Sequence, residues 1–264
     1  MSVNEGEFPQ FRRLILSRTG IDLDLYKKDQ ILRRLGGMMQ RASVSSLADY
    51  TSLLQRDQDA LHDFVERLTI NVTEFYRNPE KFRELQAKVL PELLRERGSL
   101  NIWSAGCAVG AEPYTLALML RELCGEQARR HNILATDVDA GALARAKEAL
   151  FLADDIRNVP APLRQTGFQP EGDKFRVSQT VRDMVQFRRQ NMLRDPFPSG
   201  QDLILCRNVV IYFSEEAKDR LYEQFYKSLR PGGVLFVGST ERITRFREIG
   251  FEQFLAFFYR RPKG

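Results

Sequence analysis

The sequence predicts an α/β domain with a parallel sheet, preceded by a small domain built only of helices. Residues 8–75 show helical periodicity with little strand signal, whereas strand-like and helix-like segments alternate from residue 100 onward. Such alternation is typical of parallel sheets whose connecting helices cover the two faces. We therefore expect an all-helical domain over residues 1–75, a linker with a helix over 76–99 and the α/β domain over 100–264.

The first domain is expected to contain four or so short helices. Each candidate segment spaces its apolar residues three or four positions apart, so that they fall on one face of a helix. The segments are FRRLILSRTG, KKDQILRRLGGMMQR, SSLADYTSLLQ and ALHDFVERLTI. After the break at Asn78-Pro79, residues 80–99 read as a further helix that is broken or restarted at Pro91.

The second domain is expected to begin with the strand of LNIWSAG and the helix of PYTLALMLRELCG, followed by the strand of HNILATDVD and the helix of AGALARAKEALF. The alternation resumes with DLILCRNVVIYF, EEAKDRLYEQFYKSL and VLFVGS. The interval 152–190 does not fit, because proline and glycine breaks are followed by the alternating stretches KFRVSQ and MVQFRRQ. We interpret this interval as a small antiparallel β insertion.

The composition excludes several classes of protein. With 43% hydrophobic and 28% charged residues, the chain has the composition of an ordinary globular protein. No apolar run approaches the ~20 residues of a membrane span, and the polar start MSVNEGEFPQ is unlike a signal peptide. The three cysteines are widely spaced and match no metal-ligand pattern. We therefore expect a cytoplasmic protein without membrane insertion and without a metal site.

The net charge of +5 is unevenly distributed, since basic residues dominate 12–41 and acids dominate 42–75. On a helical wheel, Lys27, Arg34 and Arg41 form a line along the flank of an apolar arc. This line is either a solvated face or a surface that docks on acidic helices of a partner. Docking by exposed charges predicts binding that weakens with salt.

The stretch SAGCAVGAEPY joins a predicted strand to a predicted helix through a turn with Gly106 and Gly110. Such a turn lets a ligand approach the backbone at a helix N-terminus, as in phosphate-binding loops. The turn has no lysine or arginine, however, and the carboxylate of Glu112 beside it would repel a pyrophosphate. The expected ligand is nucleotide-like, lacks phosphates and is partly cationic, and S-adenosylmethionine fits. Asp137, at the end of the next strand, can accept from ribose hydroxyls. The alternative is an NAD-binding domain with an atypical turn.

Five motifs occur in one order along the chain: TINVTEFYRNPEKF, SAGCAVGAEPYTLAL, ILATDVD, QNML and LCRNVVIYF. Together they closely resemble the chemotaxis receptor methyltransferases, the CheR-type family, over nearly the whole chain. The resemblance implies a Rossmann-like S-adenosylmethionine-dependent methyltransferase domain with a small antiparallel β insertion, here 152–190, after an all-helical domain. It further implies a protein-glutamate O-methyltransferase of sensory adaptation. Such enzymes esterify glutamates on the cytoplasmic helical bundles of chemotaxis receptors, and their other product is S-adenosylhomocysteine.

The resemblance also implies roles for residues at the matching positions. The residues expected around the cofactor are Asn71, Thr73, Arg77, Glu112, Asp137, Asn191, Met192, Cys206, Arg207 and Asn208. Glu112 would meet the amino-acid end of the cofactor, and Asp137 would meet the ribose. Residues 191–192 would lie by the adenine, and residues 206–207 would contribute largely through their backbone. With a receptor of this kind as the partner, the line of Lys27, Arg34 and Arg41 found on the helical wheel would be the surface that docks on its acidic helices.

Arg77 and Tyr212 are the catalytic candidates. A glutamate with a pKa of about 4.3 is already an anion at neutral pH, so methyl transfer to it needs no general base. In agreement, His62 and His131 lie outside the five motifs, and we expect both to be structural. The Arg77 guanidinium can grip a carboxylate with two prongs, and the Tyr212 phenol can help align the sulfonium with it. The alternatives are a surface salt bridge for Arg77 and a packed aromatic for Tyr212.

The sequence departs from the best-known enteric members of the family. The turn in FQPEGDKF is shorter than the glycine-rich turn that grips a tethering peptide at the receptor C-terminus, so we predict methylation without a tethering pentapeptide. VGSTERI stands where many relatives have a Gly-His-Ser-Glu run, so no histidine role carries over. DPFP resembles the signature of amino-group methyltransferases but precedes the strand DLILC, and we interpret it as a loop.

Two other functions remain open from the sequence. The net positive charge would suit a nucleic-acid methyltransferase. However, the strand end CRNVVIY favours a carboxylate substrate, and the basic segment 12–41 lacks the interleaved aromatic residues expected of a nucleic-acid surface. We therefore expect no nucleic-acid partner. A non-catalytic module, in which the cofactor only tunes partner binding, would have no need to keep both Arg77 and Tyr212.

Overall fold

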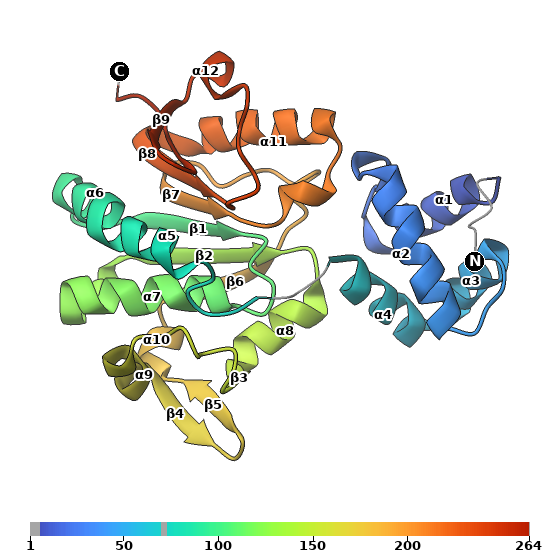
Figure 1. Cartoon of the computed structure of the whole chain (residues 1–264), viewed down its shortest axis with the longest axis horizontal. Coiled ribbons are helices and arrows are strands. Elements are labelled where there is room, and N and C mark those ends of the chain that lie inside the picture. Colours follow the sequence, from blue (N-terminus) through green and yellow to red (C-terminus); the bar gives the residue numbers. More distant parts are fainter. Residues whose placement is uncertain (1–5, 70–72, 264) are drawn as a thin grey trace. The chain divides into compact units, whose positions relative to one another are not determined.

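The computed structural model describes residues 6–69 and 73–263. The chain forms two compact units (Figure 1). The first unit comprises Met1–Asn71 and Val210–Leu221, and the second comprises Val72–Val209 and Tyr222–Gly264. The expected all-helical part and the expected α/β part are both present.

The first unit is helical and has an aromatic centre. Phe11 is fully buried, with its ring edge-on to Phe64 at 5.6 Å and near Tyr50 at 6.3 Å. Local sequence sets the helix ends, because Gly20 ends α1 in a left-handed conformation and the Ser46 hydroxyl caps α3. The helices are α1 (Phe8–Thr19), the 3₁₀ turn η1 (Leu23–Leu25), α2 (Lys28–Arg41), α3 (Leu47–Arg56) and α4 (Gln58–Thr69).

A segment from far along the chain completes the first unit. It contains the 3₁₀ turn η4 (Val210–Tyr212) and the start of α11 (Glu215–Ser228). Tyr26 forms a β-bridge with Phe213, and the two rings meet edge to face at 5.0 Å. Ser214 N–H donates to the Leu25 carbonyl at 2.9 Å. The first unit is therefore discontinuous in sequence.

The second unit is built on a seven-stranded sheet with the order β6-β2-β1-β7-β8-β10-β9. The strands from β6 to β8 run parallel, and β10 runs antiparallel between β8 and β9. The short hairpin formed by β9 and β10 was not anticipated from the sequence. The strands are β1 (Asn101–Ala105), β2 (Asn132–Asp137), β6 (Val185–Arg189), β7 (Gln201–Cys206), β8 (Leu229–Val237), β9 (Glu252–Leu255) and β10 (Phe258–Arg260).

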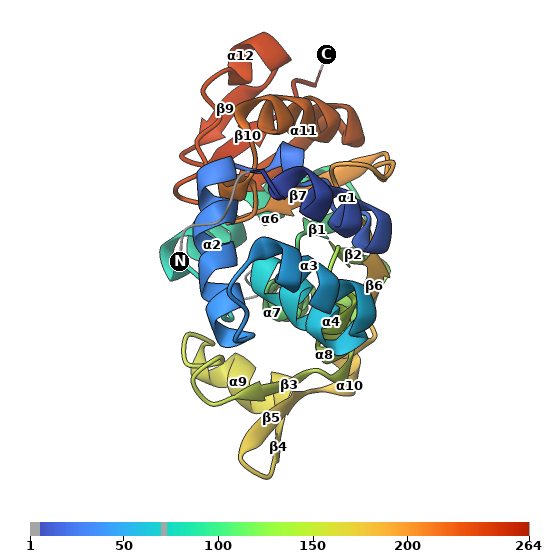
Figure 2. The same cartoon turned by 90° about the vertical axis from the view of Figure 1, so that its right-hand side faces the viewer.

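Helices cover both faces of this sheet. In Figures 1 and 2, α11 lies over one face, and α7 and α8 lie over the other. Trp103 of β1 is fully buried, with its ring 4.8 Å from Phe197 and 5.5 Å from Phe225 of α11. The strand–helix alternation read from the sequence is thus confirmed. The remaining helices are α7 (Ala111–Cys124), η3 (Gly125–Arg130), α8 (Ala140–Glu148) and α12 (Phe246–Ile249).

The helix before β1 passes through Pro91 without a break. It consists of α5 (Pro79–Glu84), the π-helical turn η2 (Leu85–Val89) and α6 (Leu90–Glu96). Proline has no N–H and its ring clashes with the carbonyl of the preceding turn. The wider turn, in which Leu90 N–H donates to the Leu85 carbonyl five residues back, lies directly before this proline.

The antiparallel insertion is present but smaller than expected. It is a three-stranded sheet with the order β3-β5-β4, and its helices are α9 (Ala161–Gly167) and α10 (Gln179–Arg182). The strands are β3 (Leu150–Leu152), β4 (Phe168–Glu171) and β5 (Lys174–Val177). The assignment of MVQFRRQ to the insertion is wrong, because β6 pairs parallel to β2 from Ile133–Val185 to Asp137–Arg189. As an edge strand β6 is only partly covered, so its residues alternate as in an antiparallel strand.

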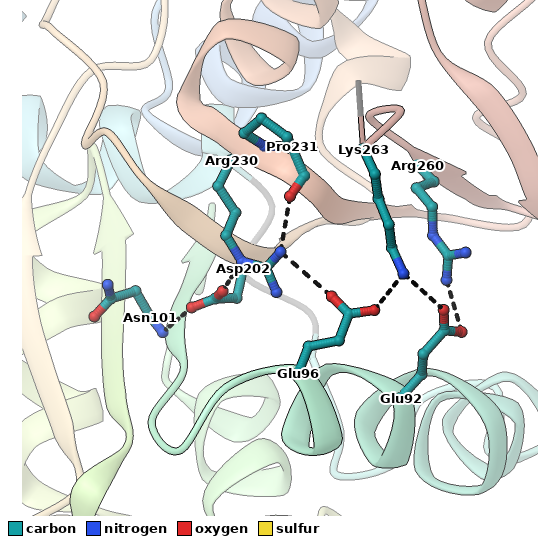
Figure 3. A network of polar contacts seen from close by, with 8 residues as sticks. All are labelled: Glu92, Glu96, Asn101, Asp202, Arg230, Pro231, Arg260 and Lys263. Carbon is teal, nitrogen blue, oxygen red and sulfur yellow. Dashed lines mark hydrogen bonds and ion pairs between the residues drawn. The ribbon is translucent and has the colours of Figure 1, made fainter.

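Ion pairs gather at the amino ends of the parallel strands (Figure 3). Asp202, on β7, is 3% exposed; one oxygen accepts the Asn101 N–H at 2.7 Å and the other pairs with Arg230. Charge pairing offsets the cost of burying this carboxylate. We call the whole group the amino-edge network; it comprises Glu92, Glu96, Asn101, Asp202, Arg230, Arg260 and Lys263.

The outer part of the amino-edge network fastens α6 to the end of the chain. Glu96 accepts from Lys263 at 2.6 Å, and Glu92 accepts from Arg260 at 2.8 Å. The hydrogen bond from Lys263 is the main reason that the pKa of Glu96 is lowered.

In the described parts of the chain, no helix combines the length and apolar character needed to cross a membrane.

Candidate functional site

The strand order of the second unit locates a site at the carboxyl ends of β1, β2 and β7. On one side of β1 the sheet continues through β2 and β6, and on the other side it continues through β7 and β8, so the chain reverses its direction of progress across the sheet between β1 and β7. In open α/β sheets, ligands bind beyond the carboxyl ends of the strands at such a switch point. The residues after these strands therefore form the candidate site.

The turn between β1 and α7 needs its glycines for two reasons. Gly106 and Gly110 have φ angles of 80° and 92°, a conformation that side chains rarely adopt. A Cβ at Gly106 would lie 2.5 Å from a methyl group of Val209, and one at Gly110 would lie 3.0 Å from the Cβ of Ala146. The N–H groups of Gly106 and Cys107 also donate to the carbonyl of Thr136 on β2. The turn is thus packed closely against both neighbouring strand ends.

Glu112 lies in the first turn of α7 with a side chain that is 13% exposed. One oxygen accepts from the Ser104 hydroxyl at 2.8 Å, and the other lies 3.4 Å from a guanidinium nitrogen of Arg207. Burial raises the pKa of Glu112, and the charge of Arg207 and the Ser104 hydrogen bond oppose that rise. An additional cation beside this carboxylate would stabilise its charged form.

Asp137 ends β2 and is 8% exposed. Its two oxygens accept the N–H groups of Ala108 at 2.8 Å and Asp139 at 3.0 Å. Burial raises the pKa of Asp137, and these backbone hydrogen bonds oppose the rise. Each carboxylate oxygen has a further lone pair, so the group can also accept from two hydroxyls of a ribose.

Arg207 follows β7 and connects it to the segment before α5. Its guanidinium lies over the rings of both Phe82 and Phe236, at 4.9 and 4.7 Å from the ring centroids. It donates to the carbonyl of Arg77 at 2.8 Å and to the side-chain oxygen of Asn78 at 2.9 Å. Its Nε has no hydrogen-bond partner among the described residues, although the side chain is 3% exposed. A buried donor of this kind can serve a ligand oxygen.

The segment that carries Arg77 is held in an unusual backbone conformation. Tyr76 and Asn78, on either side of Arg77, have φ angles of 54° and 62°. Such angles are uncommon for residues other than glycine and cluster at functional sites. Tyr76 N–H donates to the Thr115 hydroxyl at 3.2 Å, which ties the segment to α7. Thr73 is half-buried in the same segment, and Asn71 lies outside the described residues.

The segment after β6 is joined to the end of β2 through Gln190. Gln190 N–H donates to the Asp137 carbonyl at 2.9 Å. Asn191 and Met192 follow directly and are half-buried. The carboxylate of Asp195 accepts the Asn191 N–H at 2.8 Å, so DPFP is a loop that shapes this turn, as predicted.

The end of β7 supplies Cys206 and Asn208. Cys206 is fully buried, and burial raises its pKa well above the ordinary value of 9.0. Asn208 has a φ of 60° and donates its N–H to the carboxylate of Glu241 at 2.6 Å. Ser104, Asn78 and Glu241 were not predicted from the sequence. Asn78 and Glu241 contact segments far away in the chain, and Ser104 contacts Glu112 only once the turn after β1 has folded.

Tyr212 belongs to the first unit. Its carbonyl accepts the Lys27 N–H at 2.9 Å, and the guanidinium of Arg34 lies 4.5 Å from its ring centroid. Arg34 also donates to the Leu68 carbonyl at 2.7 Å. Tyr212 and two members of the basic line on α2 are therefore neighbours within this unit.

The three residues of the basic line differ in their surroundings. The Lys27 ammonium lies 3.8 Å from Glu215, and partial burial is the main reason that the pKa of Lys27 is lowered. Arg34 is half-buried, whereas Arg41 is exposed at the end of α2. The exposed surface of α2 also includes Lys28 and Arg33.

The histidines take no part in the site of the second unit. His131 precedes β2 at the amino edge, is 5% exposed and accepts the Leu100 N–H on Nδ1 at 3.1 Å. Burial lowers the pKa of His131, so its neutral form is favoured. His62 is exposed on α4 in the first unit. In the part of the chain that the structure describes, no three His, Cys, Asp or Glu side chains are grouped to hold a metal ion.

Two family models together match almost the whole chain. The CheR methyltransferase all-alpha domain matches residues 6–69, and the CheR methyltransferase SAM binding domain matches residues 71–254. The chemotaxis protein methyltransferase of Listeria monocytogenes is 37% identical over 97% of each chain. Chemotaxis protein methyltransferase 2 of Pseudomonas aeruginosa is 34% identical over 89% of this chain and 86% of the relative. Among solved structures, PKMT2 from Rickettsia typhi in complex with AdoHcy aligns with a TM-score of 0.34 at 17% identity, over 52% of this chain and 20% of that one, a likeness too weak to support an inference.

Proposed function

The chain belongs to the CheR methyltransferase family, and we propose that it methylates glutamate side chains on chemotaxis receptors. S-adenosylmethionine is its cofactor, and its activity is methyl transfer in chemotaxis. The observation that carries the finer proposal is that Arg207 joins Glu112 to the segment presenting Arg77, with no histidine beside them in the second unit. A site with cationic groups and no imidazole base suits a nucleophile that is already an anion.

The described side chains fit the cofactor. When bound, S-adenosylmethionine supplies a methyl group on a sulfonium, which a nucleophile can take directly. Glu112 would hold the ammonium of the amino-acid end, and the free Nε–H of Arg207 would donate to its carboxylate. Asp137 would accept from the ribose hydroxyls. Thr73, the pair 191–192 and, from outside the described residues, Asn71 complete the proposed set.

Arg77 and Tyr212 are proposed to orient the substrate. The guanidinium of Arg77 would bind the incoming carboxylate through two parallel hydrogen bonds, and the Tyr212 phenol would help align the reacting groups. Orientation is the main contribution required, because a correctly aligned pair avoids much of the entropic cost of meeting, worth about 7–11 kcal/mol in well-oriented reactions. Cys206 would contribute largely through its backbone, with Asn208 next to it. For Arg207 the resemblance implied a backbone role as well, but its guanidinium beside Glu112 supports a side-chain role instead.

Receptor recognition is proposed to involve the basic line on α2. Lys27, Arg34 and Arg41 would face acidic helices of the receptor's cytoplasmic bundle, and the enzyme would act from the cytoplasm. Arg34 also contacts the ring of Tyr212, so receptor binding at α2 and the position of Tyr212 would be linked within the first unit. The short turn between β4 and β5 supports methylation without a tethering pentapeptide. We retain as proposed domains residues 1–75, 76–99 and 100–264.

Transfer of a radiolabelled methyl group to purified receptor fragments tests this function. We expect base-labile label on glutamates, as an ester requires, and a loss of about 100-fold in kcat/KM for Arg77→Ala because the carboxylate clamp is gone. Arg83→Ala on α5, whose side chain is exposed, is the matched control and should be unaffected. Near-normal turnover by Arg77→Ala would remove its proposed role, and base-stable label in RNA would overturn the proposed substrate.

A further inference from the structure

The loop of residues 207–209 connects the end of β7 to both sides of the turn between β1 and α7, residues 106–110, which we call the cofactor turn. On one side, the Arg207 guanidinium reaches Glu112. On the other, Val209 packs so closely on Gly106 that no side chain could be accommodated there. The backbone of Asn208, between them, therefore determines how both contacts are made.

A single buried carboxylate holds that backbone. Glu241 lies between β8 and α12, 33 residues beyond Asn208, and is 4% exposed. One of its oxygens accepts the Asn208 N–H at 2.6 Å and also the Gly238 N–H at 2.8 Å. Hydrogen bonds from N–H groups to a carboxylate are roughly twice as strong as bonds between neutral groups. The end of β8 and the loop after β7 are thus joined at one atom.

The surroundings of Glu241 are shaped for this contact. A Cβ at Gly238 would overlap the Glu241 carboxylate and lie 3.0 Å from the Asn208 nitrogen, so only glycine lets the three groups meet. The Glu241 N–H donates back to the Gly238 carbonyl at 2.9 Å, which closes the turn. Asn208 itself has a φ of 60°, an unfavourable conformation that the hydrogen bond to Glu241 helps to hold.

The charge of Glu241 also acts on Arg207. Burial lowers the pKa of Arg207, and the negative charges of Glu112 and Glu241 oppose that effect. Glu241 therefore supports both the geometry of the loop and the charged form of the guanidinium.

We propose that Glu241 is a positioning residue for the cofactor, acting through the backbone of Asn208 on the contacts that Arg207 and Val209 make with the cofactor turn. In this proposal it acts through these contacts alone and needs no direct contact with the substrate or the cofactor. Its loss would loosen the loop, so that Glu112 loses its fixed partner and Gly106 its packing neighbour.

Calorimetric binding of S-adenosylhomocysteine to the full chain tests this proposal without any receptor. Glu241→Ala removes both hydrogen bonds, and we expect the Kd to rise about tenfold. Glu241→Gln keeps an acceptor of the same size without the charge, and we expect a rise of about threefold. With receptor fragments, the KM for S-adenosylmethionine should rise while kcat at saturation changes little; this readout alone rests on the proposed function.

Asp202→Asn is the matched control, because Asp202 is a buried carboxylate of the same sheet that also accepts a backbone N–H. We expect it to lower the melting temperature and to leave the Kd within twofold. The proposal is overturned if Glu241→Gln, folded by circular dichroism, binds with a Kd within twofold of the wild type. It is also overturned if Asp202→Asn weakens binding as much as Glu241→Gln does. A wild-type chain that does not bind S-adenosylhomocysteine would instead contradict the assignment of the cofactor.

Discussion

Buried carboxylates lie near both ends of β7, but their charges are compensated in different ways. At the amino end, Asp202 accepts a backbone N–H and pairs with Arg230 inside the amino-edge network. At the carboxyl end, Glu241 accepts two backbone N–H groups, while Glu112 and Asp137 are buried enough that their pKa values are raised. Paired charges predominate at the first end, and carboxylates with raised pKa values gather at the second.

The backbone φ angles also differ between the two ends. Ala108 and Asn208 at the carboxyl end have positive φ angles, as do Tyr76 and Asn78 in the segment bound by Arg207. Among the residues of the amino-edge network, none has a positive φ. Strained backbone and raised pKa values together are characteristic of functional sites. We infer from this comparison that one edge of the sheet mainly stabilises the fold, whereas the other is the proposed cofactor site.

The largest expected effect comes from Arg207→Ala. Removing one partner of a buried ion pair costs about 3–5 kcal/mol, because the other charge remains buried. We expect a lower melting temperature and a loss of more than about 100-fold in affinity for S-adenosylhomocysteine, measured by calorimetry.

Arg260→Ala is the control for Arg207→Ala at the opposite edge. Arg260 also lies over an aromatic ring, that of Phe254, and pairs with Glu92. Its loss should reduce the free energy of unfolding by about 1 kcal/mol without changing the affinity. If the two arginine variants changed affinity equally, the division of roles between the edges would be wrong.

An intermediate effect is expected for Glu112→Gln. The neutral amide keeps the shape but cannot pair with the cofactor's ammonium, so the affinity for S-adenosylmethionine should fall by about tenfold, or 1.4 kcal/mol. Burial raises the pKa of Glu112 even though Arg207 lies beside it, so its charged form is unfavourable in the fold. Arg207 keeps its hydrogen bonds to the Arg77 carbonyl and to Asn78 when that charge is removed. The same change should therefore make the fold slightly more stable at neutral pH, unlike Arg207→Ala, which leaves Glu112 without its cation. Glu92→Gln, at the amino edge, should leave the affinity unchanged. Tight binding by Glu112→Gln would refute the ammonium contact.

The smallest expected effect is on how the free energy of unfolding depends on pH, and it has opposite signs at the two edges. The pKa of Glu96 is lowered from 4.5 by its hydrogen bond to Lys263, so its contribution to stability is present above pH 4.5 and lost as the pH falls through the lowered pKa. The pKa of Glu112 is raised from 4.5 by burial, so its contribution is present below pH 4.5 and lost as the pH rises through the raised pKa.

Melting temperatures of Glu96→Gln and Glu112→Gln across the acid and neutral range measure this response. We expect Glu96→Gln to destabilise by less than about 1 kcal/mol near neutral pH and to converge with the wild type in acid. Glu112→Gln should differ most near neutral pH and also converge in acid, but from the more stable side. Parallel curves for the two variants would contradict the assigned pKa directions.

Local features of the sequence were sufficient to predict most of the helices and strands and to suggest part of the proposed site. Strand–helix alternation, the glycine turn and the acid at the end of β2 are each encoded within a short window, so Gly106, Glu112 and Asp137 could be placed in advance. The pairing of MVQFRRQ could not, because an edge strand of a parallel sheet shows the same alternation as an antiparallel strand. Ser104, Asn78 and Glu241 were missed because their roles depend on side-chain contacts with residues 8, 129 and 33 positions away, respectively. No local periodicity reports such contacts.

The bridge between Tyr26 and Phe213 has a consequence for engineering. Because residues 210–221 complete the helical unit, a truncated fragment ending near residue 75 would leave part of its own folding surface behind. The Tyr26 ring would lose its aromatic neighbour, and the Leu25 carbonyl would lose the N–H of Ser214. The helical unit therefore cannot be exchanged between homologues as residues 1–75 alone; residues 210–221 must be exchanged with it.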